Sequence, residues 1–465
     1  MTNWLPQLDA GIRPRYLALA NAIAADIEAG RLPPGARLPT HRNLAYRLGI
    51  SVHTVSNAYA ELDRRGHVIG QVGRGTFVTF SARPDLQEPG FILGRRESQL
   101  VDMSILRPAV GPIHAERIRD VLNRVALDQE YSSLLACRPI AGLDHHRVAG
   151  ATWVNKHGHS VGPERVMLVN GCAHGLLVAL ATLTKPGDIV ATEALTDHGL
   201  IALAGVLHFR LRGIEYDEHG IVPDALERAG HASDIKVLVL TPNYANPIAT
   251  VMPEDRRRQI ARIARRQEII IVEDDVFGPL LPHPVPPVAA FDPNRALYIT
   301  SFTKTLVSGL RVGYMVAPED LMPRLETRLR ASSWMATPLV AEIATRWIED
   351  GTAGELIIWQ QTEMRERLEI LHRHLPGRTY QAKPNTPHVF LDLPSTWRPA
   401  NFATHARLQQ VAVTPAEPFV VGESPEPQAI RITLGAATSK RQLDVGLKRL
   451  DKLLSEESEP AYINL

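Results

Sequence analysis

Polar side chains that could bind a ligand follow apolar segments in the larger, C-terminal part of the chain. They are Asn246, Asp274, Asp275, Lys304 and Arg311. Ligands of open α/β sheets bind outside the carboxyl ends of the strands, so we expect these side chains to border one ligand site. Taken singly, an acidic pair is usually structural and a lysine usually lies on the surface. The prediction therefore depends on the whole set.

A glycine-containing turn adds a second feature of this kind. The segment 171–175, of sequence Gly-Cys-Ala-His-Gly, follows the apolar segment 166–169 and opens a predicted helix. Free N–H groups at a helix N-terminus favour an anion such as phosphate. The turn predicts a phosphate site, and a purely structural turn is the alternative.

The elements that must position these side chains are apolar strands that alternate with longer helices. Strands are predicted at 166–169, 189–192, 237–241, 269–273, 296–301 and 312–317, and a helix at 254–266. Continuously apolar segments are typical of strands that are covered on both faces. The alternation predicts an α/β domain with a mainly parallel sheet. Beyond about residue 321 helices dominate except at 388–392 and 429–434, which predicts a smaller α+β lobe.

Composition excludes several classes of protein. The chain has 465 residues, of which 22% are charged and 45% hydrophobic, which is typical of a globular protein rather than a disordered one. It has no apolar run long enough for a membrane span and no signal-peptide pattern, so we expect a cytoplasmic protein without a membrane partner. Two cysteines cannot build a disulfide framework or a cysteine-rich metal centre, and no metal is expected.

The charge is distributed unevenly. The formal net charge of the whole chain is +1, yet residues 1–80 hold nine Arg, no Lys and five Asp or Glu. A basic block beside a slightly acidic body indicates two separate roles. A solvated basic surface is the alternative that charge alone leaves open.

The basic block carries a helical pattern. Apolar residues recur at helical spacing over 16–27, Thr40 can cap a second helix that ends at Gly49, and Ser51 can cap a third. The expected inner face of the third helix comprises Val52, Val55, Tyr59 and Leu62. Two helices joined by a glycine turn predict a helix-turn-helix, whose second helix enters the major groove of DNA.

Two short β runs follow and flank Gly73-Arg74-Gly75, which predicts a β-hairpin. An arginine between two glycines at a hairpin tip can approach phosphates or enter a minor groove. Within the block, the segments 35–45 (Gly-Ala-Arg-Leu-Pro-Thr-His-Arg-Asn-Leu-Ala), 48–51 and 73–78 closely resemble a GntR-type winged helix-turn-helix, and the likeness runs from about 13 to 78.

This resemblance implies that double-stranded DNA is a partner. The residues that it places at the DNA are Arg37, Arg42, Ser51, His53, Thr54, Asn57, Arg74 and Gly75.

Residues 101–450 resemble the fold-type I aminotransferases, which use pyridoxal 5′-phosphate (PLP). By this resemblance Lys304 forms the Schiff base with the cofactor, Asp274 faces the pyridine nitrogen, and Asn246 bonds the ring hydroxyl. The positions that match the phosphate site are Gly171, Cys172, Ala173, Ser301, Thr303 and Arg311. Arg431 matches the arginine that binds a substrate carboxylate.

Several positions depart from the aminotransferase pattern. Phe277 stands where a tyrosine often bonds the ring hydroxyl, and Asp197 stands where an aromatic ring usually stacks on the cofactor, with His198 as a substitute. Cys137 aligns with a tyrosine that reaches the phosphate from the neighbouring subunit. A site that keeps the lysine but lacks these groups favours ligand sensing over fast turnover.

Together the two halves resemble the MocR-type regulators. The resemblance implies a DNA-binding domain at 11–80, a linker at 81–100 and a PLP-binding effector domain at 101–465. It also implies a head-to-tail homodimer and an amine or amino-acid effector, sensed through aldimine exchange at Lys304. Two alternatives remain: an active aminotransferase with an appended DNA-binding domain, and a regulator whose body serves only for dimerisation.

Overall fold

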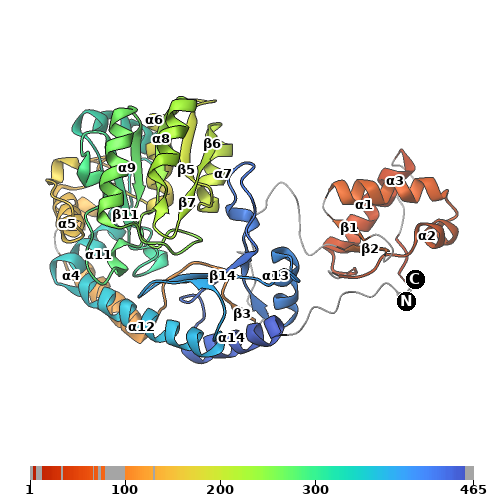
Figure 1. Cartoon of the computed structure of the whole chain (residues 1–465). Coiled ribbons are helices and arrows are strands. Elements are labelled where there is room, and N and C mark those ends of the chain that lie inside the picture. Colours follow the sequence, from red (N-terminus) through yellow and green to blue (C-terminus); the bar gives the residue numbers. More distant parts are fainter. Residues whose placement is uncertain are drawn as a thin grey trace. The chain divides into compact units, whose positions relative to one another are not determined.

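A computed structural model gives the fold of two compact units, residues 1–94 and 95–465, each described here by itself (Figure 1). The structure describes residues 4–6, 13–32, 35–65, 67–71, 75–78, 100–128 and 131–455. Except for Leu100, the expected linker at 81–100 lies outside these ranges. Among the described helices, none combines the length and the apolar character that crossing a membrane requires.

The N-terminal unit has three helices and a hairpin. They are α1 (Arg15–Glu28), α2 (His41–Leu48), α3 (Val52–Arg64) and the antiparallel strands β1 (Val68–Gln71) and β2 (Gly75–Val78). Thr40 and Ser51 cap α2 and α3, because each hydroxyl accepts a backbone N–H from three residues later. Gly49 ends α2 with a φ of 65°, which favours glycine. The expected winged helix-turn-helix is confirmed.

The core of this unit confirms most of the expected inner face of α3. Val55, Tyr59 and Leu62 are at most 4% exposed. Val52 is 46% exposed, so its predicted burial is wrong. Val52 begins the first turn of α3, and helical spacing identifies a face without showing whether a neighbour covers that turn.

The C-terminal unit is built on a seven-stranded sheet in the order β4-β12-β11-β10-β9-β5-β6. Its strands are β4 (Val166–Val169), β5 (Ile189–Glu193), β6 (Arg210–Ile214), β9 (Ile235–Leu240), β10 (Ile270–Asp274), β11 (Ala296–Ser301) and β12 (Gly313–Val316). β12 runs opposite to the other six strands, so its pairs with β4 and β11 are antiparallel and the remaining pairs of this sheet are parallel. The mainly parallel α/β sheet is confirmed, with strand ends shifted by at most two residues.

Helices cover both faces of the sheet. Alternate residues of β9 point to opposite faces, and both sets are buried in separate apolar clusters. One cluster includes α6 (Cys172–Leu183), α7 (His198–Leu207) and α10 (Met322–Ser333). The other includes α4 (Pro112–Leu127), α5 (Asp144–Lys156), α8 (Pro223–Ala232), α9 (Glu254–Arg266) and α11 (Pro338–Glu349). This two-sided burial explains the continuously apolar strand sequences.

A smaller lobe follows, as expected. Its antiparallel sheet has the order β13-β14-β17-β16, formed by β13 (Tyr380–Gln381), β14 (His388–Asp392), β17 (Ala429–Thr433) and β16 (Thr414–Pro415). Its helices are α12 (Thr352–His374), α13 (Pro399–Leu408) and α14 (Lys440–Ser455). α12 contacts both α11 and α14 and so connects the lobe to the large sheet domain (Figure 1).

Two further strand pairs complete the unit. β3 (Val101–Asp102) pairs in parallel with β15 (Val411–Ala412), which brings the segment after residue 100 against the lobe. β7 (Tyr216–Asp217) and β8 (Gly220–Ile221) form a short hairpin.

Candidate functional site

The strand order brings the expected ligand-binding residues to one end of the sheet. Asp274 is the last residue of β10 and pairs with Ile299 of β11, and Lys304 follows the end of β11 by three residues. Cys172 begins α6 directly after β4. Parallel strands place their carboxyl ends at one edge, so separate segments of the chain converge there.

Lys304 lies among four charged side chains. Its Nζ donates a hydrogen bond to the carbonyl oxygen of Leu106 at 2.5 Å. Burial lowers the pKa of Lys304; the charges of Arg431 and Arg311 lower it further, while Asp197 and Asp274 oppose the shift. A lowered pKa increases the share of neutral amine, the form that attacks a carbonyl carbon.

Asp274 presents an oxygen without a partner. Its Oδ1 atom is buried and accepts no hydrogen bond within the described part of the chain. Burial raises the pKa of Asp274 to about 7, which the Cys172 thiol opposes and the charge of Asp197 increases. A buried acceptor without a donor is costly. A ligand with a protonated ring nitrogen would supply both the missing donor and a compensating charge, so this position fits the pyridine ring of PLP.

A small polar recess lies at the N-terminus of α6. Gly171 has a φ of +81°, and a Cβ atom there would lie 3.0 Å from Thr303 Oγ1 and 3.2 Å from Arg311 Nη2. No side chain caps the free N–H groups of α6. Thr303 Oγ1 is buried and, among the described residues, lacks a partner. Free N–H groups, a hydroxyl and a guanidinium fit a phosphate group.

Two other predicted phosphate-site residues lie beside this recess. Ser301 Oγ accepts hydrogen bonds from Cys172 Sγ and from the N–H of Thr303, both at 3.4 Å. Ala173 lies in the first turn of α6 and is exposed. All six predicted positions therefore belong to the turn before α6, its first turn, or the segment between the end of β11 and the start of β12.

Asp197, Asn246 and Arg431 form a hydrogen-bonded chain. Asn246 Nδ2 donates to Asp197 Oδ2 at 2.5 Å, and Arg431 Nη1 donates to Asn246 Oδ1 at 2.8 Å. Arg431 Nη2 also donates to the carbonyl oxygen of Ser104 at 2.5 Å. Arg431 is 2% exposed, and burial lowers its pKa to about 10. Arg431 lies on β17, so the chain of bonds joins the lobe to the large domain.

The departing positions have structural roles of their own. Asp197 caps α7 by accepting the Gly199 N–H at 2.7 Å, and it carries a lowered pKa. Burial alone would raise that pKa, but His198, Lys304 and the hydrogen bonds from Gly199 and Asn246 together lower it. Phe277 is buried, 6.0 Å from the ring of His388.

Cys137 is exposed, and its carbonyl accepts a hydrogen bond from Trp334 Nε1 at 2.9 Å.

Asp275 belongs to the protein interior rather than to the site. Its carboxylate accepts hydrogen bonds from Asn243 Nδ2 at 2.6 Å and Tyr298 Oη at 2.8 Å. Its grouping with the ligand residues is therefore wrong, because neighbouring residues of an extended chain point to opposite sides. Sequence reasoning also missed the carbonyl groups of Ser104 and Leu106, for which side-chain type gives no signal.

Of the predicted DNA residues, Arg42 lies on α2, three lie on α3 (His53, Thr54 and Asn57), and Gly75 begins β2, whereas Arg37 and Ser51 precede α2 and α3. Arg37 and Arg42 are exposed, and a Cβ atom on Gly75 would lie 2.9 Å from Arg37 Nε. His53 and Asn57 share a contact of 3.3 Å between side chains one turn apart on α3. Ser51 and Thr54, at the start of that helix, share a hydrogen bond of 2.8 Å. Arg74 lies outside the described residues.

Two family models match the chain. The model described as aminotransferase class I and II matches residues 114–450, and the model described as bacterial regulatory proteins, gntR family, matches residues 15–78.

Two transcriptional regulators are similar to this chain over most of its length. The HTH-type transcriptional regulator YdeF of Bacillus subtilis (strain 168) is 28% identical over 456 residues, which cover 98% of this chain and 97% of that protein. The HTH-type transcriptional regulator YjiR of Escherichia coli (strain K12) is 30% identical over 359 residues, with 72% and 76% covered.

A solved structure has the same fold in the C-terminal unit. The kynurenine aminotransferase of Pyrococcus horikoshii, determined in complex with PMP, matches with a TM-score of 0.72 and 22% identity. The match covers 78% of this chain and 92% of that one.

Proposed function

Because the chain belongs to the aminotransferase class I and II family and carries a gntR-family domain, we propose that it is a PLP-dependent, DNA-binding transcriptional regulator that senses an amine or amino acid. The observation that carries the proposal is the surroundings of Lys304. A lysine with a lowered pKa lies among Asp274, Arg311 and Arg431, in the same chain as a winged helix-turn-helix.

In this proposal each residue of the site would bind a different part of PLP. PLP supplies an aldehyde that condenses with amines and a ring that withdraws electrons. Lys304 would hold the aldehyde carbon, Asp274 Oδ1 would accept a hydrogen bond from the protonated ring nitrogen, and Asn246 would bond the ring hydroxyl. The phosphate would take the recess formed by Gly171, the start of α6, Thr303 and Arg311.

The effector class follows from Arg431. A buried guanidinium that already donates to the Asn246 side chain of the large domain and to the Ser104 carbonyl is suited to a carboxylate or another acidic group. An effector with a primary amine and an acidic group would reach Lys304 and Arg431 together. The acidic group of the effector would replace Asn246 and Ser104 as hydrogen-bond acceptors of Arg431. This replacement would change how the lobe is held against the large domain.

The DNA-binding form is proposed to be a head-to-tail homodimer. Two winged helices related by dimer symmetry require an operator with two half-sites. Contacts from Arg37, Arg42 and Arg74 to phosphates would make the affinity strongly dependent on salt.

The test combines DNA binding with cofactor chemistry. The operator is first selected from a random duplex library with the full-length protein. Borohydride reduction, digestion and mass spectrometry should then find a pyridoxyl group on the peptide that contains Lys304. A panel of α-, β- and γ-amino acids is screened for a change in operator affinity. Lys304→Ala should retain operator binding within about 3-fold and lose any response. A normal response in Lys304→Ala would refute the sensing mechanism.

An active aminotransferase is the second candidate, favoured by the retained Asp274 and Arg431. It predicts sustained turnover when an amino acid and a 2-oxo acid are supplied together. The sensor predicts that the panel changes operator affinity without such turnover. If neither a cofactor adduct nor a response is found, the C-terminal unit serves only for dimerisation.

A further inference from the structure

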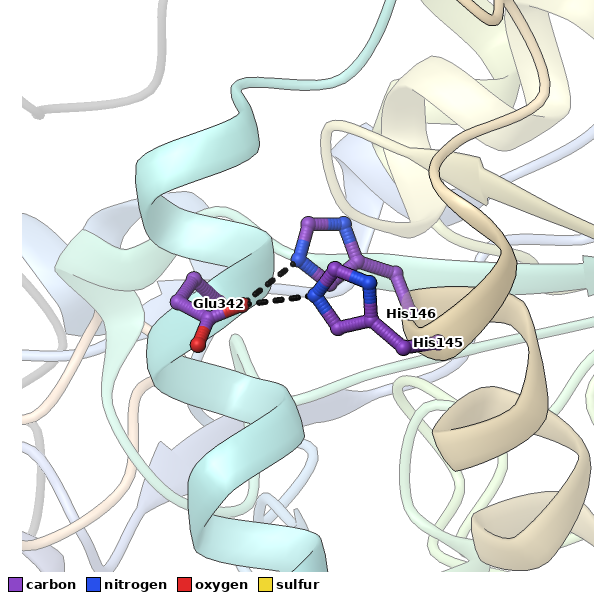
Figure 2. A group of neighbouring side chains, drawn as sticks. All are labelled: His145, His146 and Glu342. Atoms are coloured by element: carbon purple, nitrogen blue, oxygen red, sulfur yellow. Dashed lines mark hydrogen bonds and ion pairs between the residues drawn. The ribbon is translucent and has the colours of Figure 1, made fainter. Parts of the chain in front are cut away.

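We propose that His145, His146 and Glu342 bind one Zn²⁺ ion on the side of the large domain where α5 packs against α11. The three side chains converge from two helices, as Figure 2 shows. The Nε2 atoms of His145 and His146 lie 2.8 and 3.0 Å from the same oxygen, Glu342 Oε2. One ligand atom from each residue lies within 4.8 Å of the other two. This inference is independent of the proposed regulator function.

The spacing of these atoms suits a small dication. Zinc binds histidine nitrogen and carboxylate oxygen at about 2.0–2.1 Å in a tetrahedral arrangement, so its ligand atoms lie about 3.3 Å apart. To admit the ion, the two Nε2–Oε2 distances must open by a few tenths of an ångström. The two Nε2 atoms, which lie within 4.8 Å of each other, must approach to about 3.3 Å through rotation of the half-exposed His145 side chain. Two imidazoles and one carboxylate favour zinc as the bound ion. Magnesium and calcium are disfavoured because they take oxygen ligands.

The surrounding charges leave room for a cation. Arg346 Nε binds the other carboxylate oxygen, Glu342 Oε1, at 2.6 Å, and Arg346 Nη2 binds Asp128 at 2.5 Å. One guanidinium and two carboxylates give the group a formal charge of −1 when both imidazoles are neutral. Because Arg346 is shared between Glu342 and Asp128, one negative charge is left over, and a cation held by Glu342 Oε2 and the two imidazoles would balance it.

Arg346 would also orient the ligand. Partners in the outer shell of a metal site fix the orientation of the ligating groups. Because Arg346 holds Oε1, Oε2 is directed toward the two histidines.

The exposures of the side chains define an open fourth position. The His146 side chain is 1% exposed and that of Glu342 is 10% exposed, so packing fixes both. The side chain of His145 is 48% exposed, which gives the ion a route from solvent and a place for a water ligand. Three protein ligands and one water form a complete tetrahedral shell.

The site would fasten α11 next to the phosphate recess. The N–H of Thr337, the residue before α11, donates to Asn170 Oδ1 at 3.3 Å. The carbonyl oxygen of Asn170 accepts a hydrogen bond from Arg311 at 3.4 Å. An ion that clamps α11 to α5 would therefore stabilise one wall of the ligand site, in addition to the fold.

The experiment measures zinc binding to the full-length, tag-free protein after removal of metals. Titration against a chromophoric zinc chelator should give one ion per chain, and Co²⁺ in its place should show the absorption bands of tetrahedral cobalt. His145→Ala should weaken zinc binding more than about 10-fold. Its matched control is His219→Ala, because that side chain is also 48% exposed but lies outside the cluster.

The outcomes separate the proposal from a plain ion-pair network. Loss of binding in His145→Ala and Glu342→Gln, with retention in His219→Ala, supports it. Failure of the unchanged protein to bind a stoichiometric ion overturns it, and so does equal binding by His145→Ala. Because His145 is half exposed, this variant should keep the fold even if Glu342→Gln does not.

Discussion

Asp274 should destabilise the protein when no cofactor is bound, and Asp274→Asn should relieve that cost. Burial raises its pKa from 3.8 to about 7, so the folded chain holds a proton that the unfolded chain releases. The folded state therefore binds more protons between these values, and stability falls as pH rises from about 4 to about 7. Asparagine has nearly the shape of aspartate but carries no charge. The variant should therefore not lose stability at this position as the pH rises.

The size of the effect follows from the same two pKa values. By proton linkage, the raised pKa of Asp274 lowers the free energy of unfolding by about 4 kcal/mol at pH 8 and by about 2 kcal/mol at pH 5. Although its Oδ1 atom is buried, Asp274 as a whole is partly exposed, so we expect about half of each value. Asp274→Asn should then be more stable than the unchanged protein by about 2 kcal/mol at pH 8 and about 1 kcal/mol at pH 5.

The assay is urea unfolding of the PLP-free protein, followed by tryptophan fluorescence at both pH values. Five of the six tryptophans lie in residues 95–465, so the signal reports mainly on the unit that contains Asp274. Burial also raises the pKa of Glu273 to about 8 and that of Glu193 to about 7, so only the difference between the two proteins is informative. Asp320→Asn, at an exposed aspartate, is the control.

An Asp274→Asn protein no more stable than the unchanged one at pH 8 would refute this reasoning. The reasoning would also be refuted if Asp274→Asn stabilised the protein by the same amount at pH 5 as at pH 8. The variant should also bind PLP more weakly, because the proton of the ring nitrogen would lose its carboxylate.

Three more variants test the two ligand-binding regions. Gly171→Ala places a Cβ atom 3.0 Å from Thr303 Oγ1 in a backbone conformation with φ +81°, and should weaken PLP binding at least about 10-fold in equilibrium dialysis. Arg431→Met removes a charged donor and should weaken binding of a carboxylate-bearing amine about 30-fold by spectroscopic titration; equal loss for an amine without an acidic group would contradict this. Arg42→Ala should weaken operator binding in fluorescence anisotropy and lower the slope of log affinity against log salt by about one; an unchanged slope would exclude a phosphate contact.

The fold was largely predictable because its physical signals are local. The strands of the central sheet other than β6 are short, mostly apolar and largely buried, and the strands that precede Lys304 and end at Asp274 are of this kind. The edge strand β6, of sequence Arg-Leu-Arg-Gly-Ile, is largely unburied and was not predicted. The caps at Thr40 and Ser51 were predictable for the same reason, since the hydroxyl and its N–H partner lie three residues apart. The exposure of Val52 was not predictable from local sequence, because it depends on which residues of other elements cover the first turn of α3.

The candidate site was predictable in its residue types but not in its contacts. Strand alternation separates Asp274 from Asp275, yet only the structure shows that Asp275 bonds Asn243 and Tyr298, whereas Asp274 Oδ1 has no partner among the described residues. The Leu106 carbonyl that binds Lys304 lies 198 positions away along the chain. The pair His145 and His146 gave no signal either, because adjacent histidines fit no common metal-binding spacing and their carboxylate partner lies on a separate helix.

Arg431 explains how a reaction at Lys304 would be transmitted to the rest of the protein. Arg431 belongs to the lobe, and its partners Asn246 and Ser104 belong to other segments. A carboxylate bound by Arg431 competes with these acceptors, so the lobe would exchange protein contacts for a contact through the ligand. A ligand shifts an equilibrium only by its difference in affinity for the two states. Amines that react equally well at Lys304 should therefore differ in their effect on DNA binding according to their acidic group.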